Sequence, residues 1–111
     1  MRLSDLDACF VRKTVGGMDR VESLAEADGV MFQCPRCAEG KPRVGGSRGP
    51  AVAGAHYVVC WFRGKVSDDT IPGPGRWEPS GVALYDLTLT PSVDLGTSCG
   101  WHGWVKSGDA S

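Results

Sequence analysis

The chain has 111 residues, which is enough for one domain built around a single hydrophobic core. Its 41% hydrophobic and 23% charged residues are typical of a globular protein and exclude wholesale disorder. The net charge of −1 excludes a generally cationic binder of nucleic acid or membrane surfaces. The longest strictly apolar run, 57–62, is far shorter than a membrane span of about 20 residues, and the N-terminal residues resemble no signal peptide. We therefore expect one domain over 1–111, with no membrane segment.

The first third of the chain predicts two short strands and one turn of helix. Residues 8–14 and 30–33 are rich in strand-forming side chains, and a turn is expected at 15–18. Ser23 and Glu26 form a capping-box pattern, which predicts a helix of about one turn before Gly29. The second strand runs directly into a cysteine pair.

Two long segments have the composition of surface loops. Residues 40–54 are rich in glycine and carry three basic residues, and residues 64–81 contain three prolines. Within the second loop we expect Trp77 to anchor the chain to the body of the domain.

Two further strands are expected in the remaining sequence. Residues 56–63 concentrate Val, Tyr, Trp and Phe, which favour a strand. Residues 84–93 alternate leucine with threonine, which is typical of a half-buried strand. Pro91 predicts that this strand lies at a sheet edge or ends there.

Two cysteine motifs carry the chemistry of the sequence. Cys34 and Cys37 form a C-x2-C pair, and Cys99 and His102 form a C-x2-H pair. Such spacing lets both side chains of a tight knuckle face one ion, while backbone amides of the turn donate to the sulfurs. Three thiolates and one imidazole form a closed tetrahedral set for Zn²⁺, which predicts a structural rather than a catalytic site. The predicted fold is mostly β (α+β at most): a small zinc-stabilised antiparallel sheet with zinc-ribbon-like knuckles, one short helix and two long loops.

Other interpretations of these cysteines and histidines remain open. The thiols can be unligated or a redox pair, although Pro35 opposes the helix that a redox C-x-x-C requires. His56 is the only other histidine; a strand histidine without a metal is favoured, and His56 is the reserve fourth ligand if His102 points away. The segment from Cys99 to Trp104 resembles the second ligand box of Rieske proteins, but the chain has no Cys-x-His pair for the first box. Cys9 and Cys60, the remaining cysteines, are expected to be small buried hydrophobes.

The pattern as a whole is similar to a small family of uncharacterised zinc-binding proteins of tailed phages and prophages. Members of that family often carry the label ammonia monooxygenase in genomes; two histidines and no membrane helix give that label no support here. The resemblance implies a viral protein in the host cytoplasm, and implies no activity. It rests on segments spread over nearly the entire chain: 24–32, 34–37, 60–64, 72–77, 86–93 and 99–103.

Three functions compete on the sequence alone. The first is a phage accessory protein that binds a host or viral protein through its exposed loops. The second is a nucleic-acid binder that uses the basic 36–48 segment, which the net charge disfavours. An enzyme ranks last, because the carboxylates of Asp68, Asp69, Glu78 and Asp86 accompany no nucleophile–base pair and no open metal site. The residues expected to contact a partner are Arg36, Lys41, Arg43, Arg48 and Trp77.

Overall fold

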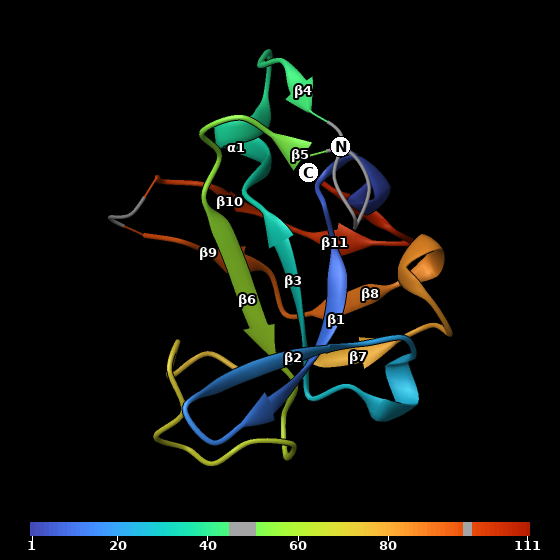
Figure 1. The fold of residues 1–111 in the computed structure, drawn as a ribbon, viewed down its shortest axis with the longest axis vertical. Helices are drawn as coiled ribbons and strands as arrows, with labels where there is room; N and C mark the ends of the chain where they lie inside the picture. The colour runs from blue at the N-terminus through green and yellow to red at the C-terminus, as the bar shows by residue number, and fades with distance from the viewer. Residues whose placement is uncertain (45–50, 97–98) are drawn as a thin grey trace.

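A four-stranded antiparallel sheet organises the computed structural model, which describes residues 1–44, 51–96 and 99–111. The strand order is β2-β1-β3-β6; in Figure 1 strands β1, β3 and β6 run vertically, and β2 crosses the lower part of the view. Its strands are β1 (Cys9–Thr14), β2 (Gly17–Val21), β3 (Gly29–Gln33) and β6 (Tyr57–Trp61). The strands predicted for 8–14, 30–33 and 56–63 are therefore confirmed. The predicted turn at 15–18 joins β1 to β2, with Gly16 at a φ of +81° that favours glycine.

Side chains alternate between the two faces of this sheet, and the buried clusters on the two faces differ in size. On the larger face, Phe10, Val30, Phe32 and Cys60 belong to the main core. On the other face, Cys9 and Val11 pack against Trp61 in a small separate cluster. The expectation that Cys9 and Cys60 are buried is confirmed, since their exposed fractions are 2% and 0%.

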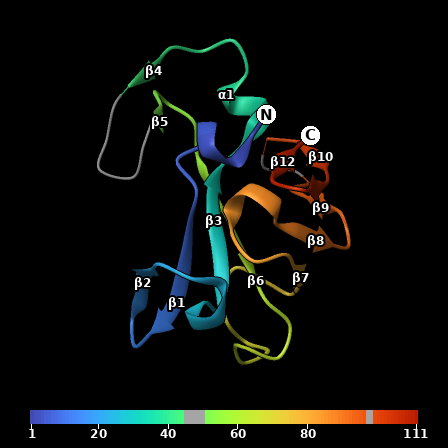
Figure 2. The same cartoon turned by 90° about the vertical axis from the view of Figure 1, so that its right-hand side faces the viewer.

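A second layer of short hairpins covers the larger face of the sheet (Figure 2). This layer contributes four buried side chains to the main core: Leu87, Leu89, Val93 and Val105. The pairs are β7 (Glu78–Ser80) with β8 (Thr88–Thr90), β9 (Val93–Asp94) with β10 (His102–Gly103), and β11 (Val105–Lys106) with β12 (Asp109–Ala110).

The strand expected over 84–93 is broken in the structure. A 3-10 turn occupies Leu84–Asp86, β8 ends at Thr90, and β9 begins at Val93. The predicted alternation holds within β8, where Leu89 is buried between half-buried Thr88 and exposed Thr90. Pro91 ends the strand as expected, because proline has no backbone N–H for a sheet ladder.

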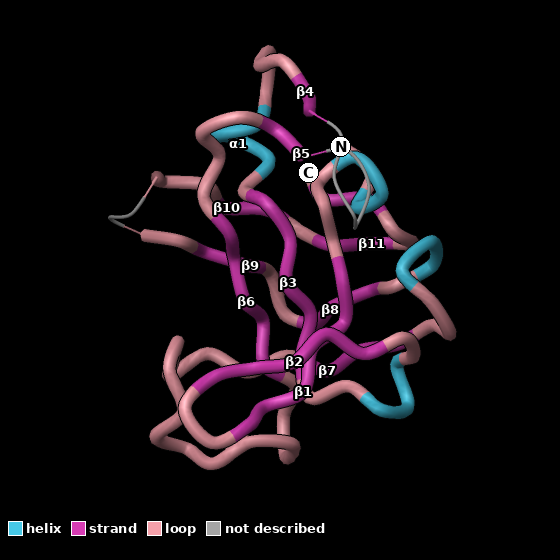
Figure 3. Tube along the Cα trace, viewed as in Figure 1, coloured by secondary structure: helices cyan, strands magenta, loops and turns pink. Residues whose placement is uncertain are grey.

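Short helical turns connect the strands (Figure 3). The helix α1 (Pro35–Ala38) is one turn long, and two more 3-10 turns lie at Leu3–Asp5 and Leu24–Glu26. The expectation that Pro35 opposes a helix is wrong for this turn, because proline is well accommodated in the first turn, where its missing N–H costs nothing. The turn predicted at Ser23 is present; its hydroxyl donates to the Glu26 carboxylate at 2.9 Å instead of capping a backbone amide.

Both segments predicted as long loops contain short strands. In the first, β4 (Arg43–Val44) pairs with β5 (Ala51–Val52). In the second, β7 begins at Glu78, and Trp77 forms an isolated parallel bridge with Phe62. Trp77 also packs against the main core, which confirms its predicted anchoring role.

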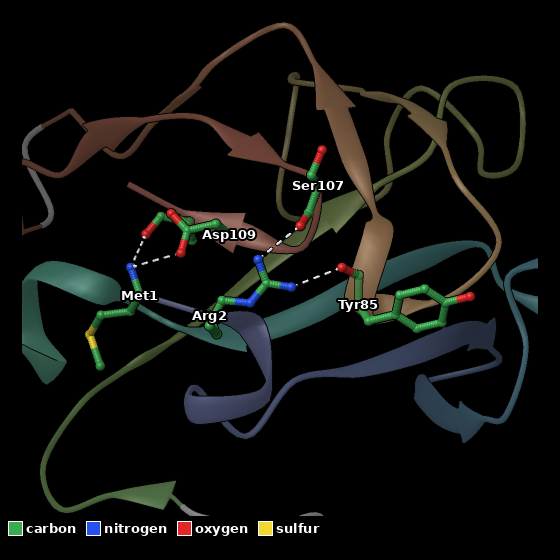
Figure 4. A network of polar contacts seen from close by, with 6 residues as sticks. Met1, Arg2, Tyr85, Ser107 and Asp109 are labelled. Atoms are coloured by element: carbon green, nitrogen blue, oxygen red, sulfur yellow. Dashed lines mark hydrogen bonds and ion pairs between the residues drawn. The ribbon is translucent and has the colours of Figure 1, made fainter.

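The two ends of the described chain lie side by side (Figures 1 and 4). The Met1 amine donates to the Ala110 carbonyl at 2.7 Å and lies 3.6 Å from the Asp109 carboxylate. The Arg2 guanidinium donates to the carbonyls of Ser107 and Tyr85 (Figure 4). Among the described residues, no helix has the length and apolar character that crossing a membrane requires.

Candidate metal centre

Cys34 and Cys37 lie at the junction of β3 and α1. The strand ends at Gln33, and the single turn of α1 returns Cys37 toward Cys34. The backbone amides of Arg36 and Cys37 donate to the Cys34 sulfur. The predicted knuckle, with amides directed at a sulfur, is therefore present at the first cysteine pair.

The register of β3 and β6 brings His56 to the same place. The Cys34 amide donates to the His56 carbonyl at 2.8 Å, which continues the antiparallel ladder one residue beyond its last pair, Gln33 with Tyr57. Residues directly opposite in such a ladder present their side chains on the same face. His56 Nδ1 consequently lies 3.2 Å from the Cys37 sulfur.

The hairpin between β9 and β10 supplies the third cysteine. The Leu95 amide donates to the Trp101 carbonyl at 2.9 Å, which draws the two arms of the hairpin together. Cys99 Sγ lies 3.0 Å from Cys34 Sγ and accepts from the backbone amide of Trp101. Gly100 follows with a φ of +77°, a conformation that glycine adopts without strain.

These three segments assemble one compact set of metal donors. The ligand atoms of Cys34, Cys37, His56 and Cys99 all lie within 4.8 Å of one another. A tetrahedral centre with Zn–S bonds of about 2.3 Å separates its ligand atoms by about 3.8 Å. The group is thus close enough to hold a metal ion. Three sulfurs and one imidazole suit zinc and not the oxygen-seeking ions magnesium and calcium.

His102 is not part of this group, which corrects the expected ligand set. Along the C-terminal segment, Trp101 and Gly103 are buried while His102 and Trp104 face outward. This two-residue period turns the His102 ring away from Cys99, because the buried Trp101 fixes which side faces the core. His102 Nε2 instead lies 3.1 Å from the Ser92 hydroxyl. The reserve ligand, His56, takes its place among the donors.

The surroundings of Cys34 and Cys99 shift the pKa values of their two thiols in opposite directions. Burial first, and then the hydrogen bond with Cys99, raises the pKa of Cys34 to about 12, against the lowering effect of the backbone amides. Burial also acts to raise the pKa of Cys99, but the hydrogen bonds from the Cys34 thiol and the Trp101 amide outweigh it, and the net pKa is lowered. Of the two thiols, Cys99 is therefore the more acidic, and a metal ion that binds both sulfurs must displace the proton of the Cys34 thiol.

Aromatic packing supports the site from the core side. Trp101 is 7% exposed and meets Phe32 edge to face, with ring centroids 6.1 Å apart. Trp101 and Cys34 belong to the same buried cluster, which places the indole beside the site. Trp104 differs, since it is 42% exposed and carries the Lys106 ammonium 4.8 Å from its ring centroid.

The residues expected to contact a partner are spread over the structure. Arg36 is exposed on α1, with its guanidinium over Gly100. Lys41 is exposed, while Arg43 donates to the Asp5 carbonyl. Arg48 lies outside the described residues. The five residues expected to contact a partner are Arg36, Lys41, Arg43, Arg48 and Trp77.

The carboxylates weighed as catalytic groups serve local contacts. Asp69 accepts from the Ser67 hydroxyl, Glu78 lies 3.8 Å from Arg63, and Asp86 accepts two backbone amides. None of these belongs to the cysteine–histidine group, and the same is true of Asp68.

His56 is a stronger candidate ligand in the structure than its sequence context suggests. Its signal was its position at the start of a strand whose alternate residues, Val58, Cys60 and Phe62, are core residues. That pattern places His56 on the inner face, but only the pairing of β6 with β3 puts it opposite Cys34. Comparison of the chain with protein-family models, curated proteins and solved structures found no match.

Proposed function

We propose that this protein is a small binding module whose fold is held by a structural Zn²⁺ ion. Cys34, Cys37, His56 and Cys99 are the ligands. The observation that carries the proposal is the convergence of three thiols and one imidazole from three separate segments within 4.8 Å. Four protein donors complete a tetrahedral shell, so the ion has no open position for water or substrate and stabilises structure.

The partner in this proposal is a host or viral protein, and the compartment is the cytoplasm of an infected bacterium. Resemblance to the phage family supports the setting. A protein partner is favoured over nucleic acid because the net charge is −1 and Arg43 already binds the Asp5 carbonyl.

Two measurements test the proposal. Elemental analysis of protein purified without chelator should give one zinc per chain in a colourless sample. Iron with visible absorption, or protein that folds without metal, would contradict the zinc assignment. For the partner, tagged zinc-loaded protein should capture a protein from infected cells, and the purified pair should bind directly. Capture that nuclease abolishes, with an affinity that falls steeply with salt, would instead indicate nucleic acid.

A further inference from the structure

The outer edge of β6 is available for strand pairing. In the order β2-β1-β3-β6 this strand is the last of its sheet. Two hydrogen bonds at the ends of the β3–β6 pair show which way the backbone of β6 faces. The Cys34 amide donates to the His56 carbonyl, and the Phe62 amide donates to the Asp28 carbonyl. Even-numbered residues of β6 therefore direct their backbone groups at β3. Backbone groups alternate along a strand, and those of Val59 therefore face outward.

The chain itself already uses part of this edge. The Trp77 amide donates to the Trp61 carbonyl at 3.0 Å, and the Arg63 amide donates to the Trp77 carbonyl at 2.9 Å. Trp77 is thus a one-residue parallel strand on β6. Before Trp77 the chain leaves the edge. Among the described residues, no hydrogen bond reaches the outward backbone groups of Val59, two residues along the same pairing line.

A groove of about 530 Å³ lies along that open part of the edge. This size is within the range of ligand-binding clefts. One wall is the proline-rich segment before Trp77, and the other includes Pro91 and Val93. Its lining residues are His56–Val59, Pro72–Trp77 and Pro91–Leu95.

The walls of the groove are fixed before any partner binds. The Trp77 indole N–H donates to the Ser92 carbonyl at 3.3 Å, which links one wall to the other. The Arg76 guanidinium donates to the carbonyls of Pro72, Thr70 and Ser67 at 3.0–3.1 Å, which holds the proline-rich wall in shape. A preformed groove loses little entropy when it is filled.

The opposite edge of the sheet has a different character. On β2, Asp19 and Arg20 are exposed, and only Val21 is buried. Charged side chains on an edge strand discourage pairing with another chain. The section of β6 that lines the groove, 57–59, carries Tyr57, Val58 and Val59 and no charged side chain.

We propose that this groove binds an extended peptide segment of a protein partner, which adds to β6 as a further strand at Val59. Its backbone pairs with the Val59 amide and carbonyl, and its side chains on one face contact the prolines and Trp77. Aliphatic or aromatic side chains suit these walls. The inference rests on the proposed function, since it names how the module holds its partner. An extended peptide is favoured over a compact ligand because the groups that face the groove are the backbone amide and carbonyl of Val59. They continue the line of backbone hydrogen bonds that Trp77 begins.

The test selects peptides from a random heptapeptide library on the zinc-loaded protein. Val59→Pro removes the outward amide without removing a β3–β6 hydrogen bond, and Val59→Thr is the matched control that keeps the amide. Selected peptides should bind Val59→Pro roughly tenfold more weakly than the wild type, and bind Val59→Thr unchanged. N-methylation of the peptide residue opposite Val59 should cause a similar loss. Zinc content and melting temperature show whether each variant is folded.

Hydrogen exchange on the wild-type protein supplies a readout that needs no variant. The Val59 amide should become protected when the peptide binds, and the amides of Asp19 and Arg20 on the opposite edge should not. Failure to select any heptapeptide, equal binding to Val59→Pro and Val59→Thr, or unchanged exchange at Val59 would overturn the inference. The proposed function fails separately, if the protein lacks zinc. If zinc is present and a cellular protein binds Val59→Pro as tightly as the wild type, only the groove inference is wrong.

Discussion

The side-chain amide of Gln33 pairs with the backbone of Val52 as one strand pairs with another. Its nitrogen donates to the Val52 carbonyl at 3.0 Å, and its oxygen accepts from the Val52 amide at 2.7 Å. Both residues are 2% exposed. Gln33 directly precedes Cys34, and Val52 leads into the segment that carries His56. This pair therefore connects two ligand-bearing parts of the chain inside the core.

Gln33→Ala is expected to destabilise the fold and weaken the metal site together. The variant leaves the buried Val52 amide without a partner, at a cost of about 1–3 kcal/mol. It also removes the shorter of two hydrogen bonds to the Val52 carbonyl, which the Ala55 amide reaches at 3.3 Å. Thermal unfolding and a competitive zinc titration measure the two effects. Ser23→Ala, which removes only a surface hydrogen bond to Glu26, should change stability by less than about 0.5 kcal/mol. Equal melting temperatures for both variants would contradict this role of Gln33.

His56→Ala should lose zinc, and His102→Ala should retain it. His56 lies among the sulfurs, whereas His102 contacts Ser92. His56→Cys restores a fourth donor of the kind zinc accepts and should recover binding. Zinc per chain after exhaustive dialysis measures all three variants. Zinc loss from His102→Ala with full retention in His56→Ala would reverse the assignment.

Cys37→Ser and Cys99→Ser should each unfold the protein at temperatures where the wild type is stable. Zinc binding energy in a structural site is folding energy, and a whole domain of this size has only about 5–15 kcal/mol of stability. A strong chelator should lower the melting temperature of the wild type in the same way, and added zinc should restore it. Both serine variants melting like the wild type would show that the metal is not needed for the fold.

Asp86→Ala should reduce stability at neutral pH and make no difference in strong acid. Hydrogen bonds from the Ala83 and Val82 amides lower the pKa of the Asp86 carboxyl below its usual 3.8. Its contribution is therefore complete above the unfolded pKa and is lost as pH falls through the folded one. Urea unfolding from pH 7 to pH 2 measures the gap, which is the difference in free energy of unfolding between wild type and variant. Asp19→Ala on exposed β2 is the control. A gap that persists at pH 2 would rule out the carboxylate as its source.

The sequence predicts the strands and the cysteine ligands better than the pairing that assembles them. Strand β6, the C-x2-C pair and the C-x2-H motif are local patterns, visible from side-chain type and spacing. The choice between His56 and His102 depends on long-range geometry: the β3–β6 register places His56 opposite Cys34, and burial of Trp101 turns His102 outward. Strand β2 was missed because four of its five residues are exposed and show no alternation.

The order of the proposed metal ligands along the chain has a consequence for biosynthesis. Cys34, Cys37 and His56 are translated well before Cys99. At ribosomal rates of about 5–20 residues per second, the interval between the third and fourth ligands lasts roughly 2–9 seconds. During that interval the nascent chain offers two thiols and an imidazole, an incomplete set with one coordination position open to water or to a cellular thiol. In the proposed zinc site the shell closes only when Cys99 arrives, so the hairpin between β9 and β10 decides when a bound ion becomes inaccessible.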